Sequence, residues 1–131
     1  MRRWAARRDT ARDRGAATLE FAALSAAVFA TLVLLVSVGL RWMAQDRAHT
    51  AARKAVEVGR SYQASPSDGV AQAREWLSHS PLLREVSVSA AGSSAQRVRV
   101  TVQGEVRAPL FGWTFHVSEH ADAPVEKWPA P

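Results

Sequence analysis

The sequence predicts an α+β protein in which a long N-terminal transmembrane helix continues into a small head with a short helix and a three-stranded antiparallel sheet. Three observations support this fold class. A twenty-residue apolar run follows a basic segment, small residues then recur at helical spacing, and the C-terminal half alternates between apolar and polar residues. The chain has 131 residues, which is enough for one small domain at most.

Most of the positive charge lies at the N-terminus. Residues 1–15 contain six arginines and two aspartates, a net charge of +4 out of +5 for the whole chain. A nucleic-acid-binding protein usually places its excess charge on a folded face. Here the charge directly precedes an apolar run, as in a positive-inside topology signal. We therefore expect residues 1–15 to be a basic cytoplasmic leader and expect no nucleic-acid partner.

The apolar run "FAALSAAVFATLVLLVSVGL" covers twenty uncharged residues from Phe21 to Leu40. As a helix it would be about 30 Å long, the thickness of the hydrocarbon layer of a bilayer. Arg41 and Trp42 follow, a pair suited to the membrane interface. A cleavable secretory signal has a shorter apolar run of about 7–15 residues and an A-x-A-like site, and none follows Leu40. We expect residues 16–42 to form a single, retained transmembrane helix, with the residues after it outside the cytoplasm.

Glu20 is a single carboxylate at the start of this helix. A carboxylate in lipid usually has a partner, and no Lys or Arg lies three or four residues to either side. Cleavage between Gly15 and Ala16 would create one, because the new α-amino group is charged near neutral pH. In parallel, axially staggered helices, Glu20 of one subunit could reach the Ala16 ammonium of its neighbour and set their register. The alternative is a plain signal anchor in which Glu20 is incidental.

At these residues the chain resembles a known family. The segment "RGAATLEF" resembles the processing signal of type IV pilins, and the form Gly-x-x-x-x-Glu-Phe is similar to the TadE-like pseudopilins of the tight-adherence (Tad) pilus system. The Ala- and Arg-rich segment "DRAHTAARKAVEVGR" adds to the resemblance, which covers residues 12–60 and does not separate TadE-like from TadF-like proteins. It implies cleavage after Gly15, a new N-terminus at Ala16, and Glu20 as the assembly carboxylate with the aromatic Phe21 beside it.

The resemblance also implies a function and partners. Such proteins are minor pilins or assembly factors with a pilin-like head, held in the cell membrane or extracted into a surface fibre. The implied partners are the membrane, a prepilin peptidase, other pilin or pseudopilin subunits, an inner-membrane assembly platform and an assembly ATPase. No cofactor and no small-molecule substrate are implied.

Residues 43–64 are expected to extend the helix beyond the membrane. Small residues fall at spacings of three and four, which places them on one helix face: Ala44, Ala48, Ala51, Ala55 and Gly59. Such a face allows close approach of another element. Packing on the protein's own sheet is favoured over a subunit interface.

Residues 65–123 are expected to form the α+β head. Ser65 or Ser67 can cap a helix over residues 67–79, with Pro66 in its first turn. Alternating segments predict strands over 85–90, 97–106 and 113–120, joined by loops at 91–96 and 108–112. In the last strand the alternation predicts three inward side chains: Trp113, Phe115 and Val117. The Pro-rich tail, residues 124–131 with Trp128, is expected to be loose.

No pattern in the sequence indicates catalysis. His116 and His120 form H-x-x-x-H on a predicted strand, without the general-base Glu of H-E-x-x-H, so we expect no metal site. No nucleophile motif and no Gly-rich phosphate loop is present. We expect that the protein is not an enzyme, since a small exported hydrolase would need such a site. The remaining alternative to a pseudopilin is a signal-anchored extracytoplasmic binding or structural domain.

Overall fold

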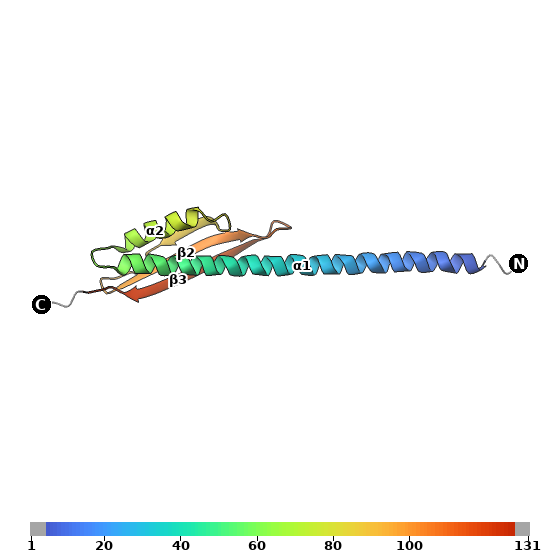
Figure 1. The fold of residues 1–131 in the computed structure, drawn as a ribbon, viewed down its shortest axis with the longest axis horizontal. Coiled ribbons are helices and arrows are strands. Elements are labelled where there is room, and N and C mark those ends of the chain that lie inside the picture. The colour runs from blue at the N-terminus through green and yellow to red at the C-terminus, as the bar shows by residue number, and fades with distance from the viewer. Residues whose placement is uncertain (1–4, 128–131) are drawn as a thin grey trace. The chain divides into compact units, whose positions relative to one another are not determined.

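The computed structural model describes the backbone of residues 5–127 and the side chains of residues 15–127. The elements are α1 (Ala5–Arg60), α2 (Pro66–Ser78), β1 (Arg84–Ser89), β2 (Arg97–Arg107) and β3 (Thr114–Pro124). Figure 1 shows the long helix, the short helix and the antiparallel sheet, in the order β1-β2-β3. The predicted fold class is therefore confirmed. The expectations for the side chains of residues 1–14 and for Trp128 lie outside the described residues.

The chain divides into two compact units, with the boundary between Val36 and Ser37 inside α1. We call residues 15–36 the apolar segment and residues 37–127 the head. Each is described by itself below.

The sheet of the head has β2 in its centre. β2 pairs with β3 without interruption from Arg97↔Pro124 to Arg107↔Thr114. Its pairing with β1 contains an irregularity between Arg84 and Ser87. Every second side chain of β2 points into the core, and the valines on this face are at most 1% exposed: Val98, Val100, Val102 and Val106. This is the face that the alternating sequence predicts.

The helical part of the head packs on this sheet through its small residues. Five alanines of α1 are 0% exposed: Ala44, Ala48, Ala51, Ala52 and Ala55. The approach of α2 is close enough that a Cβ atom on Gly69 would overlap the backbone carbonyl of Ala55. Only glycine fits there without displacing one helix from the other. The small-residue stripe therefore packs within the head itself.

The start of α2 is stabilised by its own side chains. The backbone N–H of Ser65 donates to Oδ2 of Asp68 at 2.8 Å, and the Ser65 hydroxyl donates to the same oxygen at 2.6 Å. These bonds favour the charged carboxylate and hold the pKa of Asp68 below its usual value. Pro66 is the first helical residue, where its missing N–H costs nothing. Ser65 is thus the cap, and α2 begins one residue earlier than expected.

Two expectations for the end of the chain are wrong. Trp113 precedes β3 and is 59% exposed, although Val117 is buried as predicted. Alternation correctly identified the buried face at Val117, but Trp113 lies in the turn before Thr114, where the strand alternation does not apply. The tail is not loose from residue 124, since β3 includes Pro124 and the Val125 N–H donates to the Gln96 carbonyl at 3.0 Å.

Candidate processing and assembly site

The apolar segment belongs to the single helix in the described part of the chain that is long and apolar enough to cross a membrane. Its large apolar side chains other than Val33 are exposed, from 51% at Val36 to 74% at Leu19. At 3.6 residues per turn they point in all directions around the helix. They are Leu19, Phe21, Leu24, Val28, Phe29, Leu32, Leu34, Leu35 and Val36. A helix with apolar side chains all round needs apolar surroundings on every side, which a bilayer supplies.

The hydroxyl groups of the apolar segment suit the same surroundings. The Ser25 hydroxyl donates to the carbonyl of Phe21 at 2.8 Å, and the Thr31 hydroxyl donates to the carbonyl of Ala27 at 2.9 Å. Each donor is satisfied within its own helix, so neither requires water.

The predicted site residues lie at the start of this segment. Gly15, Ala16, Glu20 and Phe21 are all exposed and follow one another on continuous helix. A Cβ atom on Gly15 would meet nothing within 4 Å. Both the proposed cleavage position and the carboxylate are therefore open to another protein.

Glu20 is the charged residue within the apolar segment. Within residues 15–127 it has neither a hydrogen-bond partner nor an ion-pair partner for its carboxylate. The residues one turn away on the helix surface are small on three of four positions: Ala16, Ala17, Ala23 and Leu24. The carboxylate is thus flanked by short side chains, and a second helix can approach it closely.

A second row of small residues begins just after Glu20 in the sequence, on the helix side that faces away from it, and was not predicted. Alanines at spacings of four are exposed on one side of the apolar segment: Ala22, Ala26 and Ala30, with Ala23 and Ala27 beside them. In membranes, small residues at this spacing are typical of helix–helix contacts because they let backbones approach. The spacing is the same as that between Ala44 and Gly59, so this row is recognisable from the sequence.

The histidines of the head are all exposed, and two of them lie near glutamates. His116 points outward, with Nδ1 at 3.1 Å from a Glu105 carboxylate oxygen, and His49 lies 3.7 Å from Glu119. His120 is exposed, and the described residues contain no group of three side chains able to hold a metal ion. Exposed pairs of this kind add little to stability.

Comparisons of the chain with family models, with curated proteins and with solved structures gave no match. The site is therefore interpreted from its own geometry and chemistry.

Proposed function

We propose that this chain is a pseudopilin or minor pilin of a Tad-type pilus or a related secretion apparatus. In this proposal a prepilin peptidase cleaves after Gly15, and the chain then assembles through its N-terminal helix. The observation that carries the proposal is Glu20, an exposed carboxylate on an apolar helix, five residues beyond Gly15 and without a partner in residues 15–127.

The position of Glu20 supports pairing with a cleaved neighbour. Ala16 lies four residues before Glu20, which corresponds to about 6 Å along a helix. A parallel neighbour shifted by about this distance would bring its Ala16 ammonium level with the carboxylate. Each charge alone is costly in lipid, whereas the pair is neutral. The alanines around Glu20 leave room for the second helix.

The proposed topology places the N-terminus in the cytoplasm and the head outside. It follows from the six arginines before Gly15 and from the far-side pair Arg41 and Trp42. The role requires no catalytic group in this chain. Peptidase, assembly platform and ATPase would act on it as partners, and the head would contact other subunits.

Processing is tested first, by intact mass and N-terminal sequencing of the membrane-extracted protein from cells with and without the peptidase. We expect a chain that begins at Ala16 only when the peptidase is present. Gly15→Leu should abolish cleavage, because a large side chain then occupies the position before the cut. Gly39→Leu is the matched control, since that glycine also has nothing within 4 Å. An uncut chain in both strains would refute the proposal.

Assembly is tested separately with Glu20→Gln, which keeps the shape and removes the charge. We expect normal cleavage but loss of cross-linked multimers in the membrane. Glu57→Gln is the control, an exposed glutamate on the same helix within the head. If neither substitution changes multimer formation, the alternative of a plain signal-anchored extracytoplasmic domain is favoured.

A further inference from the structure

The loop between β2 and β3 exposes aromatic side chains that the proposed assembly does not use. Phe111 is 77% exposed and Trp113 is 59% exposed, with ring centroids 5.7 Å apart. Leu110 beside them is 37% exposed. Among the described residues beyond Met43, the other large apolar side chain that is this exposed is Tyr62. Beyond Met43, the exposed large apolar side chains of the head thus lie in this loop, apart from Tyr62.

The backbone conformation of this loop does not favour the large residue that it contains at position 111. The Ala108 N–H donates to the Trp113 carbonyl at 2.7 Å and closes the loop. Phe111 and Gly112 both have positive φ, 64° and 65°. Glycine or asparagine is the usual choice in this conformation, and a bulky residue is strained there. A phenylalanine is uncommon in this conformation, and here its ring is exposed and not packed in the core.

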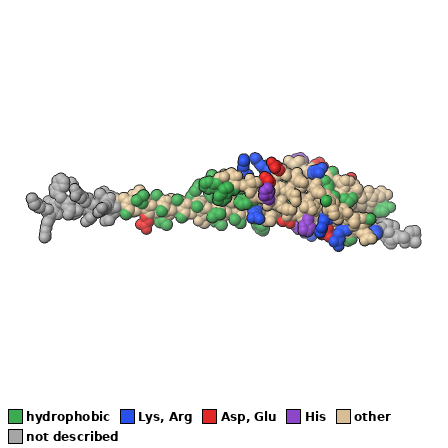
Figure 2. Space-filling view, turned by 180° about the vertical axis from the view of Figure 1, so that it is seen from behind, with side chains coloured by type: hydrophobic (Ala, Val, Ile, Leu, Met, Phe, Trp, Pro, Cys, Tyr) green, Lys and Arg blue, Asp and Glu red, His purple; other side chains and the backbone are tan. Residues whose placement is uncertain are grey.

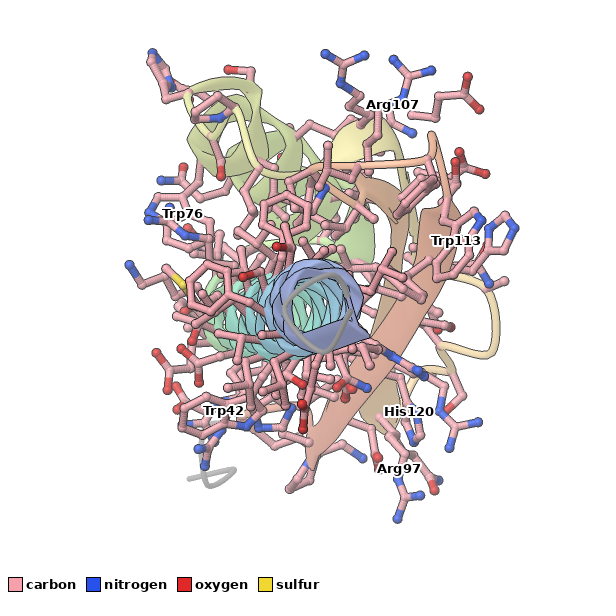
Figure 3. All side chains as sticks on the ribbon, turned by 90° about the vertical axis from the view of Figure 1, so that its right-hand side faces the viewer. Trp42, Trp76, Arg97, Arg107, Trp113 and His120 are labelled. Carbon is pink, nitrogen blue, oxygen red and sulfur yellow. The ribbon has the colours of Figure 1, made fainter. Side chains whose placement is uncertain are left out.

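The loop lies at the end of the head where α1 enters it. Phe115, two residues beyond Trp113, has the Arg41 guanidinium 5.9 Å from its ring centroid. Arg41 directly follows the apolar run, and the next residue, Trp42, is 73% exposed. Figure 3, seen along α1, shows Trp42 and Trp113 on opposite sides of the helix. Figure 2 shows apolar side chains gathered at this end of the head.

The chemistry of this end matches one partner, the interface of a bilayer. Residues 108–113 contain no charged side chain, and Arg107 precedes them. Tryptophan and phenylalanine suit the headgroup level, and arginine beside them can reach lipid phosphates. Arg41 and Trp42, which follow the membrane-length run, lie at the same end of the head.

We propose that the loop Pro109–Trp113 inserts into the outer interface of the membrane that α1 crosses. Together with Trp42 on the opposite side of the helix, it would hold the head in one orientation on the bilayer. This inference requires that the apolar run lies in a membrane, but it does not require cleavage or pilus assembly.

The chain contains no cysteine, so single cysteines can be labelled at chosen positions. We would attach a nitroxide at Phe111→Cys, Trp42→Cys and Tyr62→Cys in the full chain. Each labelled protein would be placed at one copy per nanodisc of phosphatidylethanolamine and phosphatidylglycerol. Collision rates with oxygen, which concentrates in lipid, and with a water-soluble nickel complex would then be measured.

We expect the labels at 111 and 42 to share a high oxygen-to-nickel ratio, several-fold above that at 62. A ratio at 111 equal to that at 62, with 42 in lipid, would overturn the inference and leave the span intact. A label at 42 in water would contradict the span itself, and the inference with it. Protection at 111 that appears only with several copies per disc would also overturn it, because the loop would then contact another subunit.

The variant Phe111→Asn tests the same point with the label at a second residue of the loop. Asparagine tolerates the positive φ, so the head should remain folded. With the label at Trp113→Cys, we expect Phe111→Asn to lower the oxygen-to-nickel ratio at least twofold. An unchanged ratio would contradict an insertion of the loop that depends on the Phe111 ring.

Discussion

Two stretches of α1 use alanine for opposite purposes. Between Ala44 and Ala55 the alanines are completely buried under the sheet and α2. Between Ala22 and Ala30 alanines at similar spacing are exposed. The comparison shows that a small-residue stripe specifies close approach without specifying the partner. In the head, the alanines pack against other segments of the same chain. In the apolar segment, the alanines are exposed and open to lipid or to another protein.

The largest expected effect is at the closest contact in the head. Gly69→Ala adds a Cβ that overlaps the Ala55 carbonyl. This carbonyl belongs to the backbone of α1, so it cannot rotate away as a flexible side chain could. The gain in helix propensity, about 1 kcal/mol, is outweighed by overpacking, and we expect a net loss of about 3 kcal/mol. Urea unfolding of the full chain in detergent, followed by near-ultraviolet circular dichroism, measures it. Gly39→Ala is the control and should not lower stability.

The comparison between the stripes is tested directly by the same substitution in each. Ala48→Leu should destabilise the head by about 1–3 kcal/mol, because a fully buried position has no room for three more carbons. Ala26→Leu should leave unfolding of the head unchanged and reduce cross-linked multimers in membranes, since Ala26 is exposed. Unfolding in detergent and cross-linking in membranes are measured for both variants. Equal effects of the two variants in both assays would contradict the proposed difference between the buried and the exposed alanines.

A smaller effect is expected at the rim of the buried stripe, where Lys54 lies 4.8 Å from the ring centroid of Trp76. Lys54→Gln should reduce stability by about 0.5–1 kcal/mol through loss of this cation–π contact. Lys54→Arg should retain it. The apolar segment contains no Lys or Arg, so a contact of this kind is possible only beside the buried alanines of the head. If Lys54→Arg lost as much stability as Lys54→Gln, the effect would not be due to the positive charge.

The smallest effect is a dependence on pH at the start of α2. The pKa of Asp68 is lowered by its hydrogen bonds from Ser65, so the folded state favours the charged form. Its contribution is fully present above the ordinary pKa of the carboxyl and is lost as pH falls through the lowered value. Melting temperatures from pH 7 to pH 3 should therefore fall slightly more for the natural chain than for Asp68→Asn. Identical profiles would contradict the capping role.

The sequence alone predicted most of the fold, for physical reasons that are local. Twenty uncharged residues define a membrane-length helix, alternation in β2 defines its buried valines, and Ser65 with Pro66 defines the start of α2. The candidate site is also local, because Gly15 and Glu20 are separated by a little more than one helical turn. The periodicity of one helix or strand follows from its own residues, whichever element packs against it.

Contacts between elements were decided only by the tertiary structure. Alternation placed Trp113 on the inner face, but the turn between β2 and β3 includes it, and its ring is exposed. The need for glycine at position 69 depends on the Ala55 carbonyl, which is fourteen residues away in the chain. The sequence determined the elements and their faces, and the packing of α1 and α2 on the sheet decided which faces are covered. Burial depends on the distances between segments, and these distances cannot be inferred from the residue pattern of a single segment.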